Sequence, residues 1–178
     1  MIKRILIASG GSLGEEGLVE VRPNRGAVVA KLDPSSILEV YAIRSALGEL
    51  ALKQIQTHPN LPDAATLRTL EKMASSALKL ATQENQQATI ANDLQFQETL
   101  VAASGLERCA RYFSETTVEV QRFNNLTRIV YTERESDAMH YVVGLLDAIK
   151  NRDIDKALEI WKDKFAKAVS RYMQLLEQ

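Results

Sequence analysis

A long helix begins in the stretch DPSSILEVYAIRSAL, which covers residues 33–47. Asp33 and the serines that follow it are residues that commonly cap a helix N-terminus, and Pro34 suits the first helical turn. Five of the eight glycines come before Lys31, so this stretch divides a glycine-rich head from a body that contains few glycines. The sequence therefore predicts a short β-like head that is followed by a helical body.

The body, residues 33–178, shows helical periodicity along most of its length. We expect about six helices, and these cover roughly residues 34–56, 64–83, 86–103, 106–131, 136–150 and 154–176. Short loops between long amphipathic helices favour antiparallel neighbours. The predicted fold class is therefore all-α, an antiparallel bundle of about six helices.

The head, residues 1–32, contains one hairpin signal at about residues 18–31. An alternating segment at 18–21 is followed by the turn-forming residues Arg22-Pro-Asn-Arg-Gly26 and then by a second apolar segment. The turn carries two arginines and no acidic residue. These basic side chains lie where a hairpin turn could contact DNA.

Composition limits what the protein can be. The chain has 178 residues, with 22 Lys and Arg against 23 Asp and Glu, so its net charge is -1. A protein that coats nucleic acid with its whole surface is strongly basic, which this chain is not. Its one cysteine excludes an internal disulfide and fits a reducing compartment, so we expect a cytoplasmic protein. No apolar run approaches the ~20 residues of a membrane span, and we expect no membrane partner.

Four polar residues fall on the inward stripes of the predicted helices: Arg44, Asp93, Gln97 and Lys164. Buried charge is costly unless it is paired. One interpretation is a polar pocket that holds a carboxylate ligand through Arg44 and Lys164. The other is an internal ion pair with no ligand, or a lysine whose ammonium reaches solvent.

The two histidines do not suggest a metal site. His58 lies in a loop directly before a proline, and His140 projects away from the buried stripe of its helix. With a single cysteine as the remaining soft ligand, we expect neither a transition metal nor another cofactor.

Two stretches together resemble the GntR transcription regulators of the FadR subfamily. GLVEVRPNRGAVV at residues 17–29 is similar to the wing of their winged helix-turn-helix domain, and ILEVYAIRSAL at 37–47 to the first helix of their effector domain, called FCD. NDLQFQ at 92–97, ASG at 103–105 and LLDAIKNRD at 145–153 agree with that domain. The resemblance implies that residues 1–32 are a partial winged-helix remnant and that 33–178 form an effector-binding and dimerisation domain.

Members of this family are dimers that bind DNA and respond to a small metabolite, often a carboxylate. Many hold a metal through one aspartate and three histidines. Asp93 matches the aspartate, whereas Gln97, Val142 and Lys164 stand at the histidine positions, so the resemblance implies that the metal site is absent. It also implies that the effector-binding residues, together with Arg44, lie at these positions. Gly48 and Leu106 replace a glutamate and an asparagine that are common in the family.

The resemblance assigns DNA contacts to the wing, at Arg22, Asn24, Arg25 and Gly26. The family reads operators with helices that precede the wing, and only sixteen residues, 1–16, stand there in this chain. A wing alone makes few contacts, so we expect DNA binding through a full-length form and weak or no binding by this chain.

The leading hypothesis is a ligand-sensing, homodimeric module of such a regulator that binds an anionic effector and is not an enzyme. One alternative is a truncated interaction protein that pairs with a full-length regulator and blocks it. Another is a helical-bundle enzyme in which Asp93 acts as a base or Lys164 as a nucleophile. No second acid or histidine accompanies them on the predicted buried faces.

Overall fold

The protein is described by a computed structural model that covers residues 19–22, 26–29, 33–82, 85–127, 137 and 139–177. Within these residues the chain is a bundle of helices, which confirms the predicted all-α fold. The helices are α3 (Pro34–Thr57), α4 (Ala64–Thr82), α5 (Gln86–Ala102), α6 (Glu107–Thr127), the π-helix η1 (Met139–Gly144), α8 (Leu145–Lys150) and α9 (Ile154–Leu176).

Two short strands precede the bundle. The strands β1 (Val19–Arg22) and β2 (Gly26–Val29) pair antiparallel, with Val19 opposite Val29 and Arg22 opposite Gly26. Arg22 thus ends one strand and Gly26 begins the other, whereas Asn24 and Arg25 lie outside the described residues. The assignment of this pair to a winged-helix domain, and the domain boundary at residue 32, remain predictions.

Side-chain caps set the helix starts that the sequence predicts. Asp33 Oδ1 accepts a hydrogen bond from Ser35 N at 3.1 Å, and Asp63 Oδ1 accepts from Thr66 N at 2.7 Å. Asn85 and Asp153 cap α5 and α9 in the same way. Each cap satisfies a backbone N–H that the first helical turn leaves without a partner.

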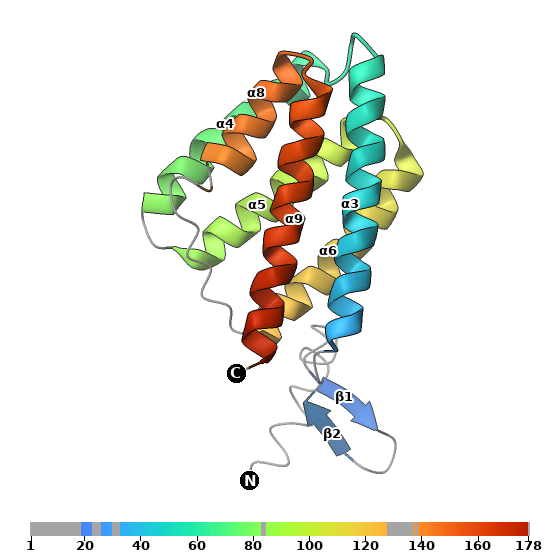
Figure 1. Cartoon of the computed structure of the whole chain (residues 1–178), viewed down its shortest axis with the longest axis vertical. Helices are drawn as coiled ribbons and strands as arrows, with labels where there is room; N and C mark the ends of the chain where they lie inside the picture. The colour runs from blue at the N-terminus through green and yellow to red at the C-terminus, as the bar shows by residue number, and fades with distance from the viewer. Residues whose placement is uncertain are drawn as a thin grey trace.

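The two longest helices form the centre of the bundle. Figure 1 shows α3 and α9 side by side along the long axis, running in opposite directions, and α6 and α5 also contact α3. α4 lies against α5, and α8 lies against α9. The buried charged side chains that the structure describes come from three of these helices, α3, α5 and α9.

Trp161 on α9 is completely buried beside Gly48 on α3. Its Nε1 donates a hydrogen bond to the Ser45 carbonyl oxygen at 3.2 Å, and its ring meets that of Phe165 edge to face at 4.9 Å. A Cβ added at residue 48 would overlap the indole ring of Trp161. The glycine therefore lets the tryptophan lie directly on the α3 backbone.

Replacing Gly48 by alanine should lower the free energy of unfolding by up to about 2 kcal/mol. Overpacking a core costs about 1–3 kcal/mol and here opposes a helix-propensity gain of about 1 kcal/mol. Urea denaturation measures the change. Combined with Trp161→Phe, Gly48→Ala should cost less than the sum of the two single changes, and a Gly48→Ala protein more stable than wild type would contradict this packing.

The segment after residue 138 differs from the prediction of one α-helix over 136–150. Met139–Gly144 form a π-helix that continues directly into α8. A π turn adds one residue to each hydrogen-bonded ring, and the buried spacing of Val142, Leu145 and Leu146 fits either kind of turn. Apolar periodicity therefore could not reveal it.

α6 is described as far as Thr127, so its expected extension to residue 131 falls outside the described residues. Among the helices that the structure describes, none combines the length and the apolar character that crossing a membrane requires.

Candidate functional site

Four of the five predicted effector-binding residues meet in one buried polar chain. Lys164 Nζ on α9 lies 2.8 Å from Asp93 Oδ1 on α5, and Gln97 Nε2 donates to Asp93 Oδ2 at 2.8 Å. Arg44 Nη2 on α3 donates to Gln97 Oε1, also at 2.8 Å. All four residues are at least nine-tenths buried. Helical periodicity thus predicted the inward direction of each side chain correctly.

Arg44 extends this chain onto α6. Its Nη1 donates to Thr117 Oγ1 at 2.8 Å and to Thr116 Oγ1 at 3.0 Å, and its Cζ lies 4.0 Å from the centroid of the Phe113 ring. Neither threonine is among the residues predicted to face the core. Thr117 falls on the buried stripe of α6 with Phe113 and Val120, and that spacing could have identified it.

The guanidinium of Arg44 is fully buried, yet its close hydrogen-bond partners are all neutral oxygens. No carboxylate among the described residues forms an ion pair with it, and its Nε has no hydrogen-bond partner there. Desolvation by burial lowers the pKa of Arg44 to about 10, so the group still carries its charge at neutral pH. Asp93 and Glu98 favour the charged form of Arg44 without an ion pair to it, and the carboxylate of Asp93 already contacts Lys164 and Gln97. Among the residues that the structure describes, the site brings together two buried cations, Arg44 and Lys164, and one buried anion, Asp93.

A small cavity of about 20 Å³ lies beside this chain. That volume accommodates about one water molecule. Its walls include the four polar residues together with Tyr41, Ile90, Leu94, Val120, Asn124 and Phe165. Val142 is buried on η1 but is not part of this lining, so the structure does not bring the fifth predicted residue to the cavity.

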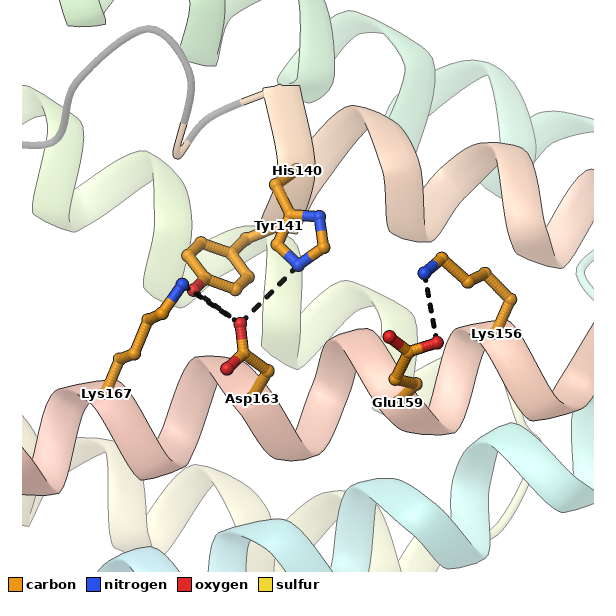
Figure 2. A network of polar contacts seen from close by, with 6 residues as sticks. All are labelled: His140, Tyr141, Lys156, Glu159, Asp163 and Lys167. Atoms are coloured by element: carbon orange, nitrogen blue, oxygen red, sulfur yellow. Dashed lines mark hydrogen bonds and ion pairs between the residues drawn. The ribbon is translucent and has the colours of Figure 1, made fainter.

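A second polar cluster joins η1 to α9 (Figure 2). Tyr141 Oη donates to Asp163 Oδ2 at 2.8 Å, and Lys167 Nζ and His140 Nε2 lie 3.1 and 3.5 Å from the same oxygen. The Tyr141 hydrogen bond is the main cause that lowers the pKa of Asp163, while burial raises the pKa of Tyr141. Lys164 Nζ is 5.2 Å from the Tyr141 ring centroid, so this cluster forms one side of the lysine's surroundings.

His140 is partly exposed, as the sequence predicts, but it is not isolated, because it contacts Asp163. No sequence signal identified Tyr141 or Asp163. Figure 2 also shows the ion pair of Lys156 with Glu159, which joins two residues three positions apart on α9. Such a pair on a helix surface contributes little to stability.

The resemblance places the family's metal ligands at Asp93, Gln97, Val142 and Lys164. In the part of the chain that the structure describes, no three His, Cys, Asp or Glu side chains gather closely enough to hold a metal ion. The place next to Asp93 is taken by the ammonium of Lys164. The expected absence of a metal remains a prediction.

A family model for the FCD domain matches residues 39–166 of this chain. The chain is also 32% identical over 93 residues to a protein of Agrobacterium vitis named "Uncharacterized HTH-type transcriptional regulator in the TAR-I ttuE-ttuC' intergenic region". That match covers 52% of this chain and 54% of the other protein, so the chain spans about half the length of this curated relative.

Solved structures show the same fold. A GntR family transcriptional regulator from Pseudomonas syringae pv. tomato aligns with a TM-score of 0.63 at 22% identity, covering 97% of this chain and 70% of the other. E. coli McbR/YncC aligns with a TM-score of 0.73 at 14% identity, covering 94% of this chain and 83% of the other. The solved structures share the fold of this chain, and the family model shows that the chain belongs to the FCD-domain family.

Proposed function

We propose that this chain is the effector-binding and dimerisation part of a FadR-type regulator and that its effector is a small molecule with a carboxylate group. One observation carries the proposal: Arg44 is fully buried, charged, and hydrogen-bonded only to neutral oxygens among the described residues. A buried cation without a counter-ion costs free energy, and a bound carboxylate would offset that cost. The protein acts in the cytoplasm and is not an enzyme.

The effector would compete with a bond that the protein already makes. A carboxylate is larger than the single water that the cavity of about 20 Å³ accommodates, so side chains in its walls must move. The ligand's carboxylate and that of Asp93 both attract the ammonium of Lys164, which now lies 2.8 Å from Asp93. Binding would therefore weaken the ion pair between Asp93 on α5 and Lys164 on α9. It would favour an arrangement of these two helices in which that ion pair is broken.

Small carboxylic acids should stabilise the protein, whereas their amides should not. An amide has nearly the shape of its acid but lacks the charge that Arg44 and Lys164 attract. Thermal unfolding with a panel of acids, each beside its own amide, tests this directly. Equal stabilisation by acid and amide, or no stabilisation by any acid, would contradict the anionic effector.

Helices α3 and α6 offer a face for a second copy of the chain. Large apolar side chains are 41–58% exposed on the neighbouring helices α3 and α6: Leu38, Ile43, Leu50, Tyr112 and Val118. Along α3, Glu39 and Lys53 are exposed seven residues before and after Ala46. A two-fold axis at Ala46 would place Glu39 opposite Lys53 of the partner subunit, which makes the face self-complementary in charge.

We expect a homodimer in solution and a monomer when this face is charged. Leu38→Glu combined with Leu50→Glu should halve the mass that light scattering measures after gel filtration, because two buried carboxylates would face an apolar surface. Leu175→Glu on α9, at a side chain that is 37% exposed, serves as the control and should leave the dimer intact. A monomeric wild type would contradict the homodimer, and a double variant that stays dimeric would place the interface on another face.

DNA contacts belong to the full-length protein in this proposal. The hairpin with Arg22 and Gly26 supplies too few basic contacts for specific binding, so this chain should bind duplex DNA weakly and only at low salt. A salt-resistant, sequence-specific mobility shift by this chain alone would contradict that expectation.

A further inference from the structure

A second and much larger cavity, of about 490 Å³, lies between the first half of α5 and the last half of α6. Its volume falls in the range of small-molecule sites. Five of the residues that line it have carboxamide side chains: Gln86, Gln87, Gln121, Asn124 and Asn125. We call this surface the carboxamide groove.

The groove adjoins the buried cavity at Arg44. Ile90, Leu94 and Asn124 line both of them, so these three residues form the wall between the two spaces. A ligand that lies in the groove is therefore separated from the cavity of Arg44 and Lys164 by one layer of side chains. One molecule can then contact both places if that layer moves apart.

None of the described residues that line the carboxamide groove is charged. Every carboxamide offers one acceptor oxygen and two N–H donors, in a fixed plane. The side chains of Gln86, Gln87, Gln121 and Asn125 make no hydrogen bond to another residue that the structure describes, and the Oδ1 of Asn124 accepts from Tyr172 Oη at 2.6 Å. The hydrogen-bonding capacity of the groove thus remains available to a ligand.

These properties select one kind of chemical group. Hydroxyl groups both donate and accept hydrogen bonds, as carboxamides do, and they carry no charge. The apolar side chains of Ile90, Ala91 and Leu94 in the same lining suit the C–H face of a hydroxylated carbon chain. An aliphatic chain would leave the carboxamides without partners, and a second charge would find no counter-ion.

We infer that the carboxamide groove is a second subsite, which binds an uncharged, multiply hydroxylated tail of the effector whose carboxylate reaches Arg44 and Lys164. This inference rests on the proposed function for the position of the carboxylate. The groove determines which acids bind more tightly, because its carboxamides favour a hydroxylated acid over an aliphatic acid of the same length.

Three probes of equal carbon number separate the two claims. Arabinonate carries the carboxylate and the hydroxyls, pentanoate only the carboxylate, and arabinitol only the hydroxyls. Calorimetric titration of the whole chain should show arabinonate binding about tenfold more tightly than pentanoate, or more, since each hydrogen bond contributes about 1 kcal/mol.

Matched variants then locate the effect. Gln121→Met with Asn125→Leu removes two carboxamides at exposed positions and nearly keeps their volume, so folding is preserved. It should weaken arabinonate about tenfold and leave pentanoate unchanged. Gln95→Met, at an exposed position of α5 that does not line the groove, is the control and should change neither affinity.

Each result decides between the claims. Pentanoate binding as tightly as arabinonate, or arabinonate binding unchanged in the double variant, would overturn the subsite while leaving the anion site intact. Binding of arabinitol that the double variant abolishes, with no gain from the carboxylate of arabinonate, would support the groove and overturn the anion site. Absence of binding by all three probes would overturn both.

Discussion

Lys164→Met should lower the free energy of unfolding by about 3–5 kcal/mol. The ammonium of Lys164 is the ion-pair partner of Asp93 at 2.8 Å, and both side chains are less than a tenth exposed. Removing one member of a buried pair leaves the other charge without compensation, which is a costly outcome. Chemical denaturation of the variant and the wild type measures the difference.

The remaining carboxylate can be removed to check this cause. Adding Asp93→Asn to Lys164→Met should recover most of the loss, because an amide needs no counter-ion. Lys162→Met is the matched control, since Lys162 is more than half exposed on the same helix and its pair with Glu49 lies at the surface. A loss below about 1 kcal/mol for Lys164→Met would mean that its ammonium reaches solvent instead of pairing with Asp93.

Arg44→Met should weaken an acidic ligand by about 2 kcal/mol, which is roughly thirtyfold in affinity, while changing stability by less than about 1 kcal/mol. Methionine fills similar space, and the loss of four hydrogen bonds is offset because a fully buried cation no longer has to be desolvated. Calorimetric titration and denaturation of one preparation give both numbers.

The split between binding and stability distinguishes a ligand site from a purely structural arginine. If Arg44 only holds α3 to α5 and α6, its replacement should cost several kcal/mol of stability and affect all ligands through unfolding. Arg108→Met, at an exposed position of α6, controls for the loss of one positive charge and should leave both quantities unchanged. An acid bound equally well by Arg44→Met would contradict the proposed role.

Much of this fold could be predicted because its determinants are local. Asp33 and Asp153 cap the helices at the expected places, since a side chain two or three residues away suffices to form a cap. The inward direction of Arg44, Asp93 and Lys164 follows from helical spacing alone. Periodicity gives the direction of each side chain, and the short loops bring the helices together.

Partners that lie on different elements could not be predicted. Lys164 contacts Asp93, and Arg44 donates hydrogen bonds to Thr116 and Thr117 on α6. These partners depend on how the helices are rotated against each other. Tyr141, which contacts Asp163, lies in the π-helix, and apolar spacing does not reveal that helix type. Val142 is buried in the core but does not line the cavity. Apolar periodicity predicts that a side chain is buried, but it does not predict which part of the core the side chain contacts.

The central claim is that a carboxylate binds at the buried Arg44, and the Nε–H group of that residue reports on it most directly. This group has no hydrogen-bond partner among the described residues. In protein labelled with ¹⁵N-arginine, with its signal identified by its absence in Arg44→Met, pentanoate or arabinonate should shift the Arg44 Nε–H resonance to saturation, and pentanamide should not. An Arg44 resonance that stays in place while the acid raises the melting temperature would contradict the account.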